Sequence, residues 1–279
     1  MTRLNAFARI ALMGTALAAP LSAQLPAPRS GDYLFATGTD DVRAMWVNPA
    51  GLARPVASLF AELAGARAID GGWRVGQYSI GLSSRNTAFS YRRDRFEGQP
   101  GIGTLRVAAG FGFNQLSLGT GVELHQSRRS WDVGLQFYPA PRVILGAVLR
   151  NIGRPVVLGA ALRLTGVASV SARLGRGALV SMDAVGVERR PAPGYDRVYR
   201  AGAQILLPLR TPVIAVSAFE FPSTASGVRL ARWSVGLSFG KLNQLVSVAT
   251  TLEPDGAARQ LDAFSLTAVA RAAAKAGPR

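Results

Sequence analysis

The clearest pattern of hydrophobic and polar positions lies between residues 104 and 125. Two runs of alternating residues flank Asn114 and Gln115, and the large apolar side chains share one parity in each run: Leu105, Val107, Phe111, Phe113, Leu116, Leu118, Val122 and Leu124. The positions between them hold small, polar or charged residues. Because successive side chains of a strand point to opposite faces, this pattern predicts a β-hairpin with one apolar face and one polar face.

Similar alternation recurs along most of the chain. Fourteen strands are predicted, over residues 57–66, 73–83, 87–95, 104–114, 116–125, 132–138, 143–150, 156–174, 178–188, 197–207, 213–221, 232–240, 244–252 and 260–270. Residues 156–164 and 168–174 are counted as one crossing, because short turns and longer loops then alternate. Repeated strands of about ten residues with one oily face are typical of membrane barrels. The sequence therefore predicts an all-β fold, a closed antiparallel transmembrane β-barrel of about 14 strands over residues 56–270.

The first 23 residues have the pattern of a secretory signal peptide. Arg3 and Arg9 supply positive charge, residues 10–19 form a short apolar run, and Ser22-Ala23 ends in small residues. We expect cleavage near Gln24, export, and insertion in the outer membrane. A segment at residues 24–55 then precedes the barrel, and a basic tail at residues 271–279 follows it.

Composition agrees with an exported membrane protein. Hydrophobic residues make up 48% of the chain and charged residues only 17%, and cysteine is absent, so no disulfide or thiolate site is available. The net charge is +16, almost entirely from arginine. We do not expect nucleic acid as a partner, because the arginines are spread over the strands and the chain is exported.

The segment before the barrel carries a distinctive motif at residues 40–53. An acidic pair, Asp40-Asp41, is followed by an apolar patch that includes Trp46, and then by the turn sequence Asn48-Pro49-Ala-Gly51-Leu-Ala. Asn before Pro favours a turn, and Gly51 permits close approach of the backbone to neighbouring strands. The segment is either a small plug in the barrel mouth or an ordinary turn leading into the first strand.

This order and spacing resembles the segment before the barrel in FadL-type and PorV-like outer-membrane proteins. Residues 132–155, with a strand, a proline turn, a strand and Arg150-Asn-Ile-Gly, also resemble the PorV-like branch. The resemblance implies a barrel with an N-terminal plug. It implies either passive transport of a hydrophobic or small amphipathic ligand or, as the alternative, a non-transporting barrel that serves another envelope protein in secretion or assembly.

Polar residues on the inward parity form the candidate lumen site. They are Arg92, Asp94, Arg106, Glu123, His125, Asp132, Gln136, Arg150, Arg163, Arg173, Arg200 and Gln204. They either cross-brace the barrel as arginine–carboxylate pairs or form a weakly anion-selective guide surface.

No chemical step is expected. His125 is the only histidine, and beside Glu123 it suggests at most a barrel-embedded hydrolase, the third and weakest reading, because nucleophilic catalysis needs a complete constellation. No cofactor or metal is expected. Four arginines assigned to outer loops, Arg128, Arg129, Arg189 and Arg190, are expected to contact phosphates of lipopolysaccharide and other outer-membrane lipids.

Overall fold

The computed structural model describes residues 34–54, 57–67, 72–95, 101–125, 128–157, 160–175, 177–190, 192–209, 213–225, 227–239, 244–251 and 263–271. The predicted signal peptide, residues 24–33 of the segment that follows it, and residues 272–279 of the tail lie outside the described residues. Among the described residues, no helix is both long and apolar enough to cross a membrane.

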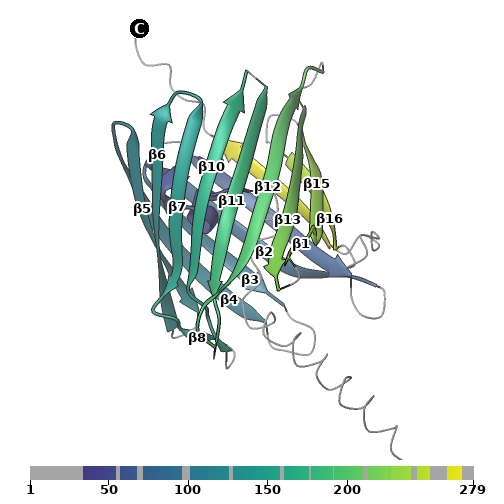
Figure 1. Cartoon of the computed structure of the whole chain (residues 1–279). Coiled ribbons are helices and arrows are strands. Elements are labelled where there is room, and N and C mark those ends of the chain that lie inside the picture. Colours follow the sequence, from purple (N-terminus) through teal and green to yellow (C-terminus); the bar gives the residue numbers. More distant parts are fainter. Residues whose placement is uncertain are drawn as a thin grey trace, which may run out of the picture.

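Fourteen long strands make up most of the described chain (Figure 1). They are β1 (Ser58–Arg67), β2 (Trp73–Ser84), β3 (Thr87–Asp94), β4 (Ile102–Phe113), β5 (Leu116–His125), β6 (Arg128–Ala140), β7 (Val143–Ile152), β10 (Thr165–Leu174), β11 (Ala178–Glu188), β12 (Tyr195–Leu207), β13 (Val213–Thr224), β15 (Arg232–Phe239), β16 (Gln244–Thr251) and β17 (Ala263–Arg271). The predicted all-β fold with about 14 antiparallel strands is confirmed.

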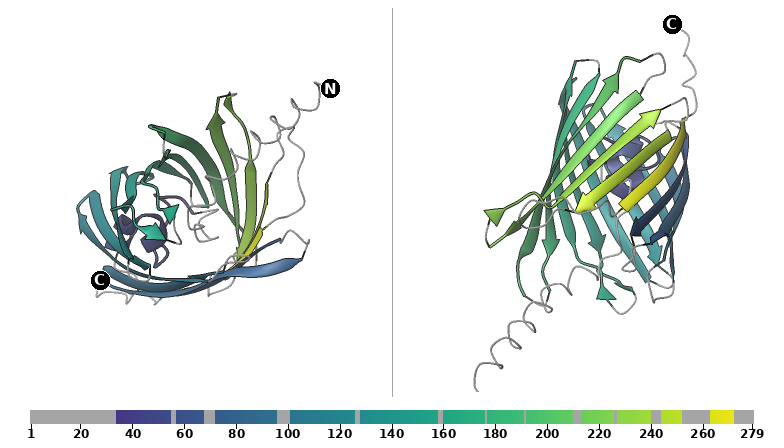
Figure 2. Two further views of the ribbon diagram at one scale, coloured as in Figure 1. Left: turned by 90° about the horizontal axis from the view of Figure 1, so that it is seen from below. Right: turned by 90° about the vertical axis from the view of Figure 1, so that its right-hand side faces the viewer.

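Every pairing between these strands is antiparallel. Each strand pairs with its neighbours in the sequence of long strands: β7 pairs with β10, β12 with β13, and β13 with β15. The last strand, β17, pairs back with β1 over the whole length from Ser58↔Arg271 to Ala66↔Ala263. Each long strand therefore has two hydrogen-bonded neighbours, and the sheet is strongly curved (Figure 2).

The predicted crossing at residues 156–174 is wrong in its first half. Only β10 joins the large sheet, whereas β8 (Val156–Val157) and β9 (Ala160–Ala161) form a separate two-stranded sheet. The chain cannot continue straight from β7 because Asn151, Gly153 and Arg154 all take positive φ before Pro155. The predicted number of long strands is still correct, because this small hairpin belongs to the connection between β7 and β10. A further two-residue strand, β14 (Gly227–Val228), pairs antiparallel with the end of β13.

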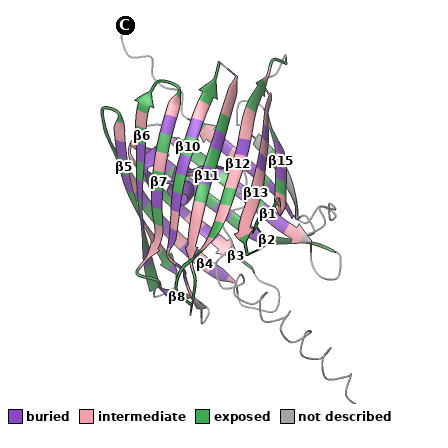
Figure 3. Cartoon of the chain, in the orientation of Figure 1, coloured by how far each residue is buried: buried purple, intermediate pink, exposed green. Residues whose placement is uncertain are grey.

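The strands expose their apolar face and bury their polar face (Figure 3). In β4, Val107 and Phe111 are 47% and 53% exposed, whereas Thr104 and Arg106 are 0% and 2% exposed. Buried serines recur at alternate positions of other strands, such as Ser79 in β2. A protein folded around an oily core has the opposite arrangement, so the outward face of this sheet is suited to hydrocarbon.

The two ends of the sheet differ in their connections. At the short-turn end, tight turns at residues 85–86, 114–115 and 141–142 join β2 to β3, β4 to β5 and β6 to β7. Arg85 and Asn114 take positive φ there, as tight hairpins often require. Ser58 pairs with both Ser83 and Arg271, so the sheet begins and finishes at this same end. The longer connections lie at the opposite, long-loop end.

Candidate functional site

The interior contains residues 34–54, called here the inner segment. It includes the short helix α2 (Ala44–Val47) and the 3-10 helix η3 (Pro49–Ala53), and nearly all of its apolar side chains are buried. In Figure 2 it lies within the curve of the strands, and η3 packs against β4, β5 and β6. Residues 34–54 therefore fold back inside the sheet before β1 begins.

A row of glycines forms the seat for η3. Gly110 of β4, Gly119 of β5 and Gly134 of β6 are register partners on adjacent strands. A Cβ at Gly110 would lie 2.5 Å from the Ala53 nitrogen, and one at Gly119 would overlap the backbone of Pro49 and Ala50. The lack of side chains here lets the backbone of the inner segment rest directly on the wall.

Gly51 also allows a close approach, but not the one expected. A Cβ on Gly51 would collide with the carbonyl oxygen of Thr39 and the Cβ of Ala44, which both belong to the inner segment. The close contact between this turn and the strands is made instead by the glycines of the strands. The sequence did not reveal which glycines make which contact, because the atoms that approach a glycine depend on how the turn folds back.

Asn48 joins the inner segment to the wall. Its Nδ2 donates to the carbonyl oxygens of Ala36 at 2.9 Å and Leu135 of β6 at 3.1 Å, and its Oδ1 accepts from the Ala50 N–H at 3.1 Å. Gln136, the next residue of β6, donates to the same Ala36 carbonyl at 2.9 Å. The predicted turn at Asn48-Pro49 is thus also a crosslink made of hydrogen bonds.

Arginines from four strands hold the inner segment from different sides. Arg150 of β7 donates to the Val47 carbonyl, and Arg200 of β12 donates to the Leu34 carbonyl at 3.1 Å. Arg92 of β3 and Arg106 of β4 place their guanidinium carbons 4.5 and 5.1 Å from the ring centre of Trp46. Such contacts are favourable cation–π geometries.

The acidic pair ties the inner segment to the short-turn end. Asp41 accepts from Arg43 at 2.7 Å and from Arg271, the last residue of β17, at 3.0 Å. Asp40 pairs with Arg271 at 3.0 Å and with Arg54 at 3.4 Å. Burial by itself would raise the pKa of Asp41, but the positive charges of Arg43 and Arg271 hold that pKa well below its usual value.

Several of the predicted charged residues of the lumen form buried networks, whereas Arg173 is exposed. Arg106 binds Asp132 at 2.5 Å and also pairs with Glu123. His125 lies with Nε2 3.1 Å from Glu123 and Nδ1 3.0 Å from the Thr104 hydroxyl. A second network joins Arg92, Asp94 and Gln77. In both networks the arginine pairs with a carboxylate, which is the arrangement of cross-bracing pairs.

His125 is the residue that suggested a barrel-embedded hydrolase. Among the described residues, no group of three or more His, Cys, Asp or Glu side chains is placed to hold a metal ion. His125 is 1% exposed, and its contacts are to Thr104 and Glu123.

Arg163 is the member of the predicted set that does not lie on a strand. It lies in the connection between β9 and β10, where it is buried and 3.9 Å from Asp196. Two of the four arginines assigned to outer loops are also placed differently, because Arg128 and Arg129 are the first residues of β6. Arg189 and Arg190 follow β11 and pair with Asp196 and Glu188.

A chain of buried hydroxyls was missed by sequence reasoning. Thr37 of the inner segment contacts Ser169 at 2.9 Å and Ser171 at 2.5 Å, both on β10, and Ser171 contacts Ser181 of β11 at 2.6 Å. Asp183 accepts from Ser169 and pairs with Arg200 at 3.5 Å. Serines on the inward parity of consecutive strands were the available signal, but they carry no charge and did not stand out.

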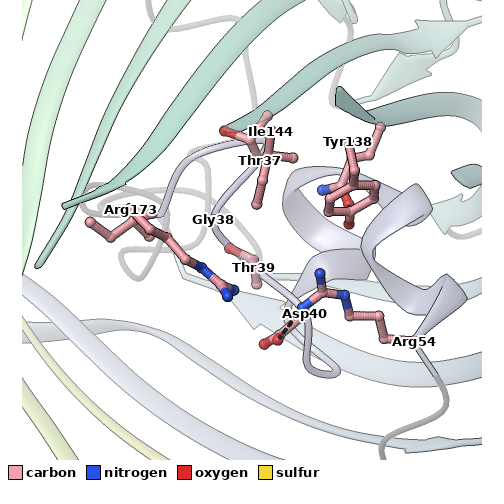
Figure 4. Close-up of a pocket in the computed structure, with 10 residues that line it drawn as sticks. Thr37, Gly38, Thr39, Asp40, Arg54, Tyr138, Ile144 and Arg173 are labelled. Carbon is pink, nitrogen blue, oxygen red and sulfur yellow. Dashed lines mark hydrogen bonds and ion pairs between the residues drawn. The ribbon is translucent and has the colours of Figure 1, made fainter. Parts of the chain in front are cut away.

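A small pocket opens beside the inner segment (Figure 4). It is lined by Thr37, Gly38, Thr39, Asp40, Arg54, Gln136, Tyr138, Ile144, Arg173 and Leu179, and encloses about 20 Å³. The Arg54 guanidinium lies 5.1 Å from the Tyr138 ring centre. The pocket has room for about one water molecule, so it does not by itself form a passage.

Comparison with known proteins shows the fold but no family. No family model matches the chain, and no curated protein matches it. A solved structure titled CymD monoaromatic hydrocarbon channel is 13% identical, with a TM-score of 0.52, and the match covers 87% of this chain and 95% of that one. A bacterial polysaccharide outer membrane secretin (12% identity, TM-score 0.49, 78% and 99% covered) and a mutant Rh. blastica porin (7%, 0.45, 77% and 98%) are less similar. The chain is thus similar in fold to the CymD channel, at an identity too low to place it in a family.

Proposed function

We propose that this chain is a closed transmembrane β-barrel of the outer membrane, exported through a cleaved signal peptide. The observation that carries the proposal is the reversed burial of the sheet. Its outward face exposes large apolar side chains from strands all around the ring, whereas charged residues such as Arg106 and Asp132 are 2% exposed inside. Hydrocarbon outside and a polar interior account for both faces.

The inner segment is proposed to act as a plug in a passive channel for hydrophobic or small amphipathic molecules. It occupies the interior, where it packs on the glycine seat and in an apolar cluster with the wall. Its other contacts with the wall are hydrogen bonds, ion pairs and cation–π contacts, which water or a polar ligand can replace. The likeness in fold to a structure titled as a hydrocarbon channel supports this proposal. No chemical step is involved, so passage depends on pore shape and on the position of the plug. FadL-like transport of hydrophobic molecules is the first candidate function.

A specific observation favours the second candidate, a sealed barrel that serves another envelope protein, as in the PorV-like branch. The inner segment is attached to β6 by Asn48, to β7 by Arg150, to β12 by Arg200 and to β17 by Asp41. A segment held from so many sides is well suited to close a barrel permanently.

Conductance separates the two candidates. The full mature chain and two variants, one lacking residues 34–54 and one carrying Asn48→Ala with Arg150→Ala, are reconstituted in planar bilayers. If the chain is a transporter, liposomes that carry the intact chain should take up a small aromatic hydrocarbon. Both variants should then show higher conductance than the intact chain. No uptake by the intact chain, together with stable co-purification of one envelope protein, would favour the sealed barrel.

A further inference from the structure

The small pocket beside the inner segment lies at the short-turn end of the interior. Two of its lining residues, Arg173 and Leu179, are register partners next to the last pair of the hairpin formed by β10 and β11. The backbone N–H of Tyr138, which also lines the pocket, donates to the carbonyl of Gln115 in the turn between β4 and β5. The pocket is therefore at the level where the short turns border the interior.

Two arginines from different parts of the chain point into this pocket. Arg54 follows η3 at the end of the inner segment, Arg173 comes from β10, and their guanidinium groups face the same space from two sides (Figure 4). The side chain of Arg54 is 41% exposed. Arg173 is also exposed, and within the described residues its side chain forms no ion pair. Other exposed arginines, such as Arg142 in a short turn, do not line this pocket.

The negative charge near the pocket is already shared among other cations. The acidic pair of the inner segment is bound by three arginines, which are Arg43, Arg54 and Arg271. Arg173 adds a fourth positive charge, and Asp40 is the only acidic residue among those that line the pocket. Four guanidinium groups thus accompany two carboxylates, so the pocket is suited to an anion.

The rest of the lining is partly apolar. Ile144 is 7% exposed, and a methyl group of Leu179 lies 3.5 Å from the position of a Cβ on Gly38, so Leu179 packs against the inner segment. The ring of Tyr138 lies beneath the Arg54 guanidinium. The enclosed space of about 20 Å³ holds about one water molecule. It can therefore receive one oxygen atom of a ligand whose remaining atoms lie outside, toward the short turns.

We propose that this pocket binds the carboxylate group of a small amphipathic monoanion, with Arg54 and Arg173 as the groups that hold it. Guanidinium groups suit carboxylates because they donate two parallel hydrogen bonds. The apolar lining favours an organic anion over an inorganic one, and the carboxylate of Asp40 disfavours a second negative charge on the ligand. The inference names a ligand class for the proposed channel and rests on that proposed function.

The test measures binding of benzoate to the full mature chain in detergent micelles by isothermal titration calorimetry. Benzamide, which has the same shape and no charge, is the matched ligand and should bind far more weakly. A hydrogen bond to a charged group is strong enough to change affinity about tenfold, so Arg173→Gln should weaken benzoate binding about tenfold. The matched control Arg142→Gln removes an exposed arginine from the same end and should bind benzoate like the wild type.

Asp40→Asn tests the sign of the effect. Removal of this negative charge should strengthen benzoate binding, because Arg54 and Arg271 then have one carboxylate fewer to balance. A substitution that only loosened the inner segment would weaken binding instead. Heat-modified migration on gels verifies that each variant folds.

Four results would overturn the inference: equal binding of benzoate and benzamide, equal loss in the Arg173 and Arg142 variants, weaker binding by the Asp40 variant, or tighter binding of inorganic phosphate than of benzoate. Uptake of an aromatic hydrocarbon by liposomes that carry the same chain is measured in parallel. Uptake without benzoate binding would reject this site and leave the proposed channel standing. Benzoate binding with the expected variant pattern but without uptake would support the site and reject the channel.

Discussion

Gly119 of β5 faces the backbone of Pro49 with no space for a side chain between them. This contact joins two residues 70 positions apart in the sequence, and it fixes how closely η3 approaches the wall. We expect Gly119→Val to displace the inner segment and to destabilise the protein by about 1–3 kcal/mol, the usual cost of overpacking.

The matched control for that change is Gly166→Val in β10, where an added Cβ would meet nothing within 4 Å. Urea unfolding and limited proteolysis within residues 34–54 measure the effect. Greater proteolysis in the Gly119 variant than in the Gly166 variant is expected, and equal behaviour of the two would contradict the glycine seat.

Both the donating Nδ2 and the accepting Oδ1 of Asn48 should contribute to the stability of the protein. Asn48→Ala leaves the carbonyl of Leu135 and the N–H of Ala50 without these partners, whereas Asn48→Asp keeps the acceptor for Ala50. A buried group left without its hydrogen bond costs about 1–3 kcal/mol. Unfolding in urea should show both variants destabilised. An alanine variant as stable as the wild type would show that Asn48 does not crosslink the segment.

Removing Arg106 should be far more costly than removing an exposed arginine. Arg106→Gln leaves Asp132 and Glu123 buried without their cation, and breaking a buried pair costs about 3–5 kcal/mol. Arg154→Gln breaks the exposed pair with Glu188, which is expected to cost about 0–1 kcal/mol. Comparable losses in urea unfolding would argue that the buried network is not a structural brace.

Acid should weaken the attachment of the inner segment through Asp41. Since the folded-state pKa of Asp41 is depressed below its usual value of 3.8, its contribution is complete above that value and is lost progressively as the pH falls below about 4. The stability difference between the wild type and Asp41→Asn should therefore be largest near neutral pH and shrink in acid. Urea unfolding from pH 7 to pH 3 measures it, and a difference that grows in acid would contradict the sign.

Position along the outer face should determine the cost of a charge there. Val107 lies in the middle of β4 and is 47% exposed, whereas Tyr195 begins β12 at the long-loop end and is 54% exposed. In a lipid-facing barrel, Val107→Arg should cost about 2–4 kcal/mol and Tyr195→Arg about 0–1 kcal/mol. Equal costs in liposome-based unfolding would indicate that hydrocarbon does not contact Val107.

The alternation of residues was enough to predict the strands and their faces. The run from Leu105 to Leu124 yielded a hairpin whose turn at Asn114-Gln115, outward parity and polar inward parity all appear in the structure. Strand periodicity is a local property, so it can be read from neighbouring positions. The same reasoning failed at residues 156–164, because alternation there could not reveal the backbone turn made by Asn151, Gly153 and Arg154.

What the sequence determined by itself was therefore the all-β class, the approximate number of strands, and which residues point inward. Only the tertiary structure decided how those residues are combined. It placed Gly110, Gly119 and Gly134 under one turn, set Trp46 between Arg92 and Arg106, and brought Arg271 to Asp41 across 230 residues. The physical reason is that side-chain parity follows from each strand alone, whereas these contacts depend on strand register and on the path of the inner segment, which no local pattern encodes.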